Sequence, residues 1–227
     1  MSPKKSEKKL TWKQIDIEGK LDTLLRTIKK TKNETPENKT RLLGKVDRWE
    51  EQIEEINDKI KYIKGRLAPR LERELDLKIK NKEALVTALF QPSTKNLFLE
   101  IEAEYRGNDN PFEDDSFNDL ISLSEIAKRF ALLGDAAISM AVIYHLWRMD
   151  KDVGKLTQDK SSIVSNEHMV ELCDKWGLYK HRIHFDPEIP SKGEIQHDKG
   201  TLVEAVYGIV LMEYGFDDVL KNINHLL

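Results

Sequence analysis

The sequence of 227 residues contains a single cysteine, Cys173. One cysteine excludes an intramolecular disulfide bond, and it leaves no cysteine cluster that could hold zinc. The six histidines also lack the close pairing that is typical of a metal-binding helix. The shortage of cysteine therefore favours a cytoplasmic protein, and it gives no support to a zinc site.

The chain also lacks a long apolar run and an excess of positive charge. No stretch reaches the roughly 18 to 20 apolar residues of a membrane span, because Glu204 and Glu213 interrupt the most apolar late stretch. Residues 1–9 are basic but have no apolar core of the kind found in a signal peptide. The formal net charge of −3 does not indicate a general binder of polyanions. A nucleic-acid surface would therefore require local clusters of Lys and Arg.

Alternating apolar and polar residues, which are typical of a half-buried strand, are also missing from the sequence. Apolar residues recur instead every three or four positions, which predicts a fold that is all-α. A chain of this length with 39% hydrophobic residues can bury one good core and still carry an extension. We expect a helical hairpin over residues 1–74 and a globular helical domain over residues 75–227.

The N-terminal part carries the most regular pattern in the chain. Residues 17–28 form one apolar stripe, and a second helix is predicted to start near Pro36 and to stop or kink at Pro69. A short polar link favours an antiparallel hairpin of the two helices. The second stripe alternates steps of four and three, which is typical of a coiled-coil seam that could pair within one chain or between chains. The stripe consists of Leu42, Val46, Trp49, Ile53, Ile56, Ile60, Ile63 and Leu67.

A cluster of cations lies where the hairpin meets the globular domain. Such a cluster could contact the phosphates of a nucleic acid. It could equally be a solvated charged face, because Glu72, Glu74 and Asp76 lie among the cations. The cations are Lys61, Lys64, Arg66, Arg70, Arg73, Lys78, Lys80 and Lys82.

An acidic stretch over residues 100–119 contains Gly107, Asn108 and Pro111, which break regular structure. We interpret it as a loop-like insertion. Acidic loops repel nucleic acid, so this one could shield a surface or face a basic partner, although ordinary solvation explains it equally well.

The stretch around which the chain is organised is residues 121–149, which we predict to be one long buried helix. Phe130 and Met140 recur on its apolar face, and Asp135 stands among apolar neighbours. Glu204 occupies a similar position in a second apolar helix, predicted over residues 197–215. A carboxylate in such surroundings needs a partner. It could be capped or paired with a cation, or it could be a metal ligand or catalytic acid.

Four segments, taken in order, resemble the ribonuclease III family. The run LLGDAA at residues 132–137 is similar to the signature helix of that family. Residues 77–93 resemble its opening helix, residues 153–178 its middle helices, and residues 200–215 its last motif. The resemblance covers roughly residues 75–227 and implies a helical fold, a two-fold homodimer, double-stranded RNA as the ligand, and magnesium as the cofactor.

The resemblance also implies a site of four carboxylates on two facing helices. The matching positions in this chain are Ala131 and Asp135 on the first helix, and Thr201 and Glu204 on the second. Only Asp135 and Glu204 keep the acid, so the predicted magnesium site is depleted and weak. Lys128 lies about two turns before Asp135, and we expect its ammonium to supply the positive charge that a metal otherwise would.

These observations leave three functions open. The first is a ribonuclease III-like dimer that binds or helps to process structured RNA without efficient cleavage. The second is an active magnesium-dependent endoribonuclease that uses Asp135 and Glu204. The third is an interaction scaffold in which the hairpin recruits a protein partner, and a continuous exposed apolar strip on the hairpin would favour it.

Overall fold

The computed structural model describes residues 10–107, 110–112, 116–147, 152–185 and 190–227. Within these ranges the chain is built from helices and contains no strand, apart from an isolated parallel bridge between Phe90 and Ile183. The prediction of an all-α fold is confirmed. None of the helices in the described part combines the length and the apolar character needed to cross a membrane.

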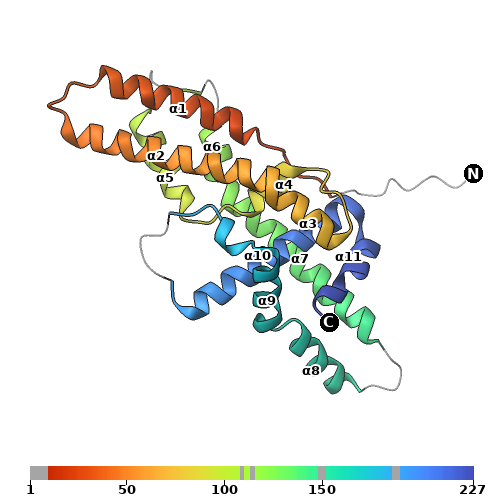
Figure 1. The fold of residues 1–227 in the computed structure, drawn as a ribbon. Helices are drawn as coiled ribbons and strands as arrows, with labels where there is room; N and C mark the ends of the chain where they lie inside the picture. The colour runs from red at the N-terminus through yellow and green to blue at the C-terminus, as the bar shows by residue number, and fades with distance from the viewer. Residues whose placement is uncertain (1–9, 108–109, 113–115, 148–151, 186–189) are drawn as a thin grey trace, which may run out of the picture.

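The helices follow one another along the chain with short connections (Figure 1). Their bounds are α1 Ile17–Glu34, α2 Thr40–Tyr62, α3 Ala68–Leu75, α4 Lys82–Ala88, α5 Thr94–Glu104, α6 Ser116–Ile121, α7 Leu123–Leu146, α8 Val153–Ile163, α9 Asn166–Trp176, α10 Lys192–Tyr214 and α11 Phe216–Asn222. A π-helical segment η1 (Ile63–Leu67) and two 3₁₀ turns, η2 (Tyr179–His181) and η3 (Ile223–His225), complete the set.

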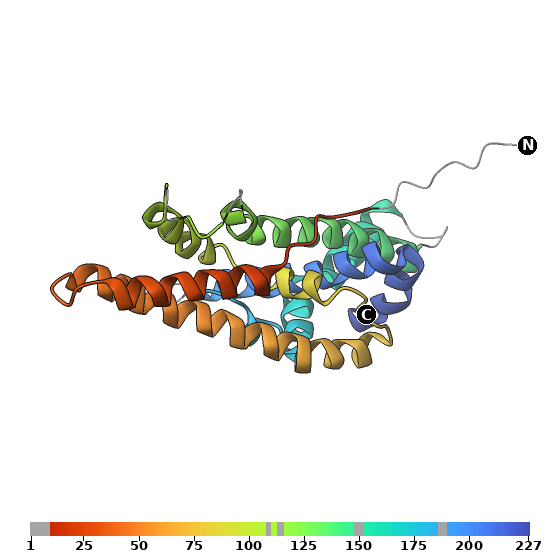
Figure 2. The same ribbon diagram turned by 90° about the horizontal axis from the view of Figure 1, so that it is seen from above.

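The first two helices form the predicted antiparallel hairpin, which extends beyond the other helices (Figure 2). Their apolar stripes face each other within one chain, so the seam is satisfied without a second copy. Every member of the stripe from Val46 to Leu67 is buried. The Lys32 ammonium binds Asp47 and Glu50 across the hairpin, each at 2.8 Å. The second helix begins at Thr40 rather than near Pro36, because residues 36–39 form the turn.

Of the two outcomes predicted for Pro69, a stop or a kink, the stop is wrong, because the chain stays helical beyond it. The backbone passes from α2 into η1 and on into α3, and Pro69 lies in the first turn of α3, where its missing N–H breaks no helical bond. The extra residue per turn of a π-helix changes the direction of the side chains that follow. The chain leaves α3 at Asp76, whose positive φ of 49° gives a left-handed cap.

Three charged side chains join the hairpin to the globular domain. The Lys64 ammonium, on η1, binds Glu18 of α1 and Glu83 of α4. Burial opposes the charged form of Lys64, but the two carboxylates outweigh it, so the pKa of Lys64 is raised. Partly buried ion pairs of this kind restrict how the three elements can sit relative to one another.

The hydrophobic core runs without interruption from the hairpin into the remaining helices. Trp49 packs against Tyr105 with ring centroids 6.4 Å apart, and the Tyr105 hydroxyl donates to Thr31 Oγ1 at 2.8 Å. The segment before α1 runs back along α7 (Figure 2), and Trp12 meets Phe130 edge-on at 5.3 Å. A division at residues 74/75 stays a prediction, and the apolar core crosses it.

The acidic stretch 100–119 is more helical than predicted. Its first residues complete α5, and its last residues begin α6. Residues 108–109 and 113–115 of the predicted loop lie outside the described residues. Asp119 accepts from Lys13 at 2.8 Å and lies 3.3 Å from the Lys20 ammonium. Lys45 and Arg48 of α2 bind Glu104 and Glu100. The acids therefore hold the hairpin and the N-terminal segment against α5 and α6.

Candidate functional site at the crossing of α7 and α10

The site is created by two glycines that let α7 and α10 cross at backbone contact. A Cβ atom placed on Gly134 would lie 1.7 Å from the carbonyl oxygen of Glu204. A Cβ on Gly208 would lie 2.0 Å from the carbonyl oxygen of Phe130. No other pair of elements makes such extensive contact in the described part of the chain. Any side chain at either glycine would therefore push the two helices apart.

Asp135 and Glu204 lie on either side of this crossing. Asp135 follows Gly134 on α7, and Glu204 precedes Gly208 by one helical turn on α10. Burial, followed by the negative charge of Asp135, raises the pKa of Glu204 to about 7. The two carboxylates come from facing helices and interact electrostatically. Asp135 itself is exposed rather than surrounded by apolar groups, because α7 turns this face away from the core.

The two remaining positions of the predicted site carry neutral side chains. Ala131 is buried one turn before Asp135, and Thr201 is half-buried one turn before Glu204. Among the described residues no group of three or more acidic, histidine or cysteine side chains could hold a metal ion. The donor set is therefore two carboxylates. It fits magnesium bound mainly through water, because this ion is commonly held by one or two carboxylates together with water and phosphate.

Lys128 does not lie where the sequence placed it. Its ammonium binds Glu125 Oε1 at 2.9 Å, and both side chains are about half exposed. Residues three apart share one helical face, so Glu125 is a nearer partner for Lys128 than Asp135, seven residues away. The only charge that contributes to the raised pKa of Glu204 is that of Asp135. The prediction that Lys128 balances the carboxylate pair is therefore corrected.

The predicted cluster of basic residues is largely engaged in contacts within the protein. Lys64 binds two carboxylates, as described above, and Lys82 donates to the Lys64 carbonyl oxygen at 3.3 Å. Lys80 lies 3.6 Å from the centre of the Tyr214 ring and donates to the Glu213 carbonyl oxygen at 3.0 Å. These three side chains connect helices and are not arranged as one phosphate-binding surface.

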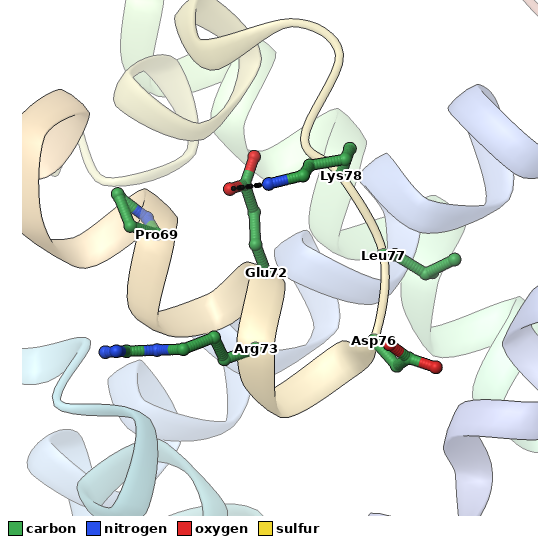
Figure 3. Close-up of a pocket in the computed structure, with 6 residues that line it drawn as sticks. All are labelled: Pro69, Glu72, Arg73, Asp76, Leu77 and Lys78. Carbon is green, nitrogen blue, oxygen red and sulfur yellow. Dashed lines mark hydrogen bonds and ion pairs between the residues drawn. The ribbon is translucent and has the colours of Figure 1, made fainter.

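The other members of the cluster lie on different sides of the junction. Lys78 binds Glu72 at 3.3 Å beside an open cavity at the end of α3 (Figure 3). Arg70 donates to the carbonyl oxygen of Lys175. Lys61 binds Asp58 at 3.1 Å. The cavity does not serve as an anion site in this arrangement, because the Glu72 carboxylate points into it beside the Lys78 ammonium (Figure 3).

Comparison with known proteins relates the sequence around this crossing to a known protein family. Residues 128–215 match the model of the ribonuclease III domain. This part of the chain is similar in sequence to a ribonuclease III domain. The matched residues include Ala131, Asp135, Thr201 and Glu204 and both glycines of the crossing. The predicted resemblance is confirmed.

Two curated relatives illustrate the similarity. Ribonuclease 3 of Lactococcus lactis subsp. cremoris (strain MG1363) is 29% identical over 121 residues, which cover 51% of this chain and 52% of the relative. Ribonuclease 3 of Flavobacterium psychrophilum is 33% identical over 91 residues, which cover 39% of this chain and 36% of the relative. The chain thus spans about half the length, or less, of the curated relatives that it matches.

One face of α7 is apolar and exposed, and the sequence pattern predicted it only in part. Leu132 and Met140 are 72% and 60% exposed, and Tyr144 and Trp147 are exposed beyond them. We expected both Phe130 and Met140 on the buried apolar face of this helix, but only Phe130 is buried, with Trp12 packed against it. Steps of about four residues from Leu132 to Tyr144 were the available signal, and they place these side chains on one side of α7.

Proposed function

We propose that this chain is a ribonuclease III-like protein that binds double-stranded RNA as a two-fold homodimer and does not cleave it efficiently. The observation that carries the proposal is the pair of interacting carboxylates at the α7–α10 crossing, with Ala131 and Thr201 in the two other positions. The family match supports RNA as the ligand. The two neutral residues support weak metal binding, because half of the expected charge is missing.

Magnesium is the metal that this donor set fits. Asp135 and Glu204 would hold it, and the ion would supply Lewis-acid activation of water next to a phosphodiester. The surrounding residues bring the two carboxylates together and keep Glu204 half-buried. At neutral pH Glu204 is divided between its protonated and ionised forms, because its pKa lies near 7. A proton and a cation therefore compete for the same carboxylate.

The exposed face of α7 supports the homodimer. Leu132, Met140, Tyr144 and Trp147 form an apolar surface that no described residue covers. A two-fold arrangement would bring the same surface of both copies together. Sedimentation equilibrium at micromolar concentration should give a dimer, and Met140→Glu should give a monomer. Leu99→Glu is the matched control, because Leu99 is exposed on α5, away from this face. A monomeric wild-type protein would contradict the proposal.

Gel shifts with a blunt RNA duplex test the binding function. In the proposed dimer, a valley between the two copies would contact the duplex through its A-form shape and its 2′-hydroxyl groups. The affinity should therefore not depend on the base sequence of the RNA. Binding should be clear at low salt and should fall steeply at moderate salt, because contacts to phosphates release counterions. Duplex DNA of the same sequence should bind more weakly. A protein that fails to shift duplex RNA at low salt would refute this function.

The active endoribonuclease is the second candidate, and the retained Asp135–Glu204 pair favours it. Ala131→Glu combined with Thr201→Asp would restore the missing charge. We expect this double variant to bind magnesium more tightly and to cleave duplex RNA faster than the wild-type protein. Equal cleavage by the two proteins, abolished in both by Glu204→Gln, would instead establish the wild-type chain as an active nuclease.

A scaffold that recruits a protein through the hairpin receives no support from the hairpin surface. Between α1 and α3, Tyr62 is the exposed large apolar side chain, and the other members of the stripes are buried or partly buried. The continuous apolar strip that we set as the condition for this function is therefore absent from the described hairpin.

A further inference from the structure

Tyr62 is exceptional on the hairpin because it is a large aromatic side chain that remains 41% exposed. It lies at the end of α2, immediately before the π-helical segment η1. Its ring stacks on His181, which comes from η2 between α9 and α10. The two ring centroids are 4.0 Å apart, and the planes differ by 23°. Two elements that lie far apart in the sequence thus build one aromatic surface, which we call the Tyr62–His181 platform.

Three positive charges act on the histidine of this platform. After burial, the charges of Lys180, Arg70 and Lys59 lower the pKa of His181, and no carboxylate contributes to the shift. The imidazole is therefore neutral at pH 7, which favours stacking over ion pairing. The nearest acids along α2 have partners of their own. Glu55 binds Lys59 at 2.7 Å, and Asp58 binds Lys61 at 3.1 Å.

Two exposed cations lie close in sequence to the residues of the platform and are available to a ligand. Within the described part of the chain, the side chains of Arg66 and Lys180 have no hydrogen-bond or ion-pair partner, and both are exposed. Arg66 follows Tyr62 by four residues, and Lys180 directly precedes His181. One free cation therefore comes from each of the two segments that supply the rings. This contrasts with Lys64, Lys80 and Lys82, whose ammonium groups are engaged within the protein.

We propose that the Tyr62–His181 platform binds single-stranded RNA, with an unpaired base on the aromatic surface and its phosphates at Arg66 and Lys180. A combination of exposed aromatic rings and unpaired cations is the chemistry that binds unpaired nucleotides, because every base has a face that stacks and every linkage carries a negative charge. Bases within a duplex are already stacked and cannot use the rings. An acidic peptide would satisfy the cations but would leave the rings unused.

This inference rests on RNA as the ligand of the chain, and it goes beyond the proposed duplex binding. An RNA with a duplex and a single-stranded tail would engage two surfaces of the protein. The tail would then contribute affinity through linkage to the duplex, even if its own binding is weak. The α7–α10 crossing and the platform lie on different elements, so each can be changed without altering the side chains of the other.

The test measures fluorescence anisotropy with three labelled RNAs: a blunt duplex, the same duplex with a ten-nucleotide uridine tail, and the free ten-nucleotide uridine strand. The wild-type protein should bind the tailed duplex at least tenfold more tightly than the blunt one. Tyr62→Leu, which keeps apolar bulk but removes the ring, should remove most of this difference. Tyr62→Phe should retain it. Thermal melting of each variant checks that the fold is intact.

A second pair of variants tests whether the tail needs the two cations of the platform or only the total positive charge of the protein. Arg66→Ala with Lys180→Ala should reduce the preference for the tailed duplex and leave the affinity for the blunt duplex unchanged. The matched control is Lys39→Ala with Arg41→Ala, which removes two exposed cations at the opposite end of α2. The control should leave both affinities nearly unchanged.

The outcomes distinguish the two proposals. If the protein binds the blunt duplex but gains nothing from the tail, the platform proposal is wrong and duplex binding stands. If the free strand binds through Tyr62 and the blunt duplex does not bind, the platform proposal stands and duplex binding is wrong. A Tyr62→Leu variant that is folded and retains the full preference for the tail would also overturn the platform proposal.

Discussion

Two clusters of charge at helix junctions differ in how they are balanced. At the junction of hairpin and domain, Lys64 lies between Glu18 and Glu83, so two acids share a cation that the protein itself supplies. At the α7–α10 crossing, Asp135 and Glu204 interact without one, and the pKa of Glu204 is raised to about 7. The first cluster holds elements together. The second has to be balanced from outside, by a proton or by a bound cation.

The difference shows how a binding site can be distinguished from a structural ion pair. A structural cluster gains nothing from remaining short of charge, and Lys64 reaches both of its acids. A site for a cation must leave acids without an internal partner, at a cost in stability. Lys128 could have reduced that cost, but it binds Glu125 instead. Variants at each cluster test the two halves of this comparison.

The largest effect should come from Gly134→Ala, which removes the close crossing that brings Asp135 and Glu204 together. The new Cβ would lie 1.7 Å from a backbone oxygen of α10, and backbone cannot move aside as a flexible side chain can. We expect a loss of about 3 kcal/mol or more, as for severe overpacking, and a melting temperature lower by roughly 10 °C.

Gly44→Ala is the control for this variant. Gly44 lies in α2, and the Cβ that alanine adds there would have no other atom within 4 Å. Alanine should therefore stabilise the helix by up to about 1 kcal/mol. Chemical denaturation of both variants checks the prediction. A Gly134→Ala protein as stable as the wild type would show that the helices can separate without penalty.

The next effect concerns pH. Glu204 has a folded-state pKa of about 7, above its unfolded value of about 4.5, so the folded state holds a proton that the unfolded state has released. Stability should therefore be highest below pH 4.5 as far as this group is concerned, and should fall as pH rises from 4.5 through 7. With allowance for solvent screening, the loss is about 2 kcal/mol. Glu204→Gln should remove this fall, and thermal melts across this pH range measure it.

Adding magnesium to these thermal melts tests whether the carboxylate pair binds a cation. At pH 8 the ion should raise the melting temperature of the wild-type protein, because it binds the ionised pair, whereas at pH 5 protonated Glu204 should abolish the effect. Lys128→Ala should respond to magnesium as the wild type does, since Lys128 binds Glu125 and not the carboxylate pair. A magnesium response that changed in Lys128→Ala would restore the original role predicted for this lysine.

The smallest effect should follow Lys64→Met, which keeps the length of the side chain and removes its charge. Glu18 and Glu83 would then lose their shared cation, and the hairpin would lose an attachment to α4. We expect a loss of about 1 kcal/mol, because the cluster is only partly buried. Lys61→Met, at an exposed pair with Asp58, should change stability by less than about 0.5 kcal/mol. Equal urea midpoints for the two variants would contradict this distinction.

Periodicity was sufficient to predict the hairpin because its core is local. The stripe from Val46 to Leu67 is buried as expected. Alternating steps of four and three that continue over many turns keep the apolar side chains on one helical face, which packs against a second helix. The predicted start of α2 and the predicted stop at Pro69 were wrong, because both depend on backbone geometry at a turn and in a π-helical segment. A pattern of apolar residues carries no information about either.

The candidate site was predictable only through its motif. Asp135 and Glu204 were identified because they match a family pattern, and in the structure they lie across one helix crossing. The partner of Lys128 was wrong, because seven residues along a helix specify a face but not which acid an ammonium reaches. The Tyr62–His181 stack has no local signal in the sequence, since its two rings come from segments that meet only in the folded chain.

The uninterrupted core has a consequence for the order in which the chain folds. Glu213 accepts hydrogen bonds from the backbone N–H groups of Lys80 and Asn81, far earlier in the chain, and Trp12 meets Phe130 over a similar separation. During synthesis the hairpin leaves the ribosome before the helices that follow it and can pair its two helices at once. The apolar surface that it shares with the rest of the core must then wait until later helices have emerged, because long-range contacts form late. Translation speed after α2 therefore sets how long that apolar surface stays accessible to chaperones.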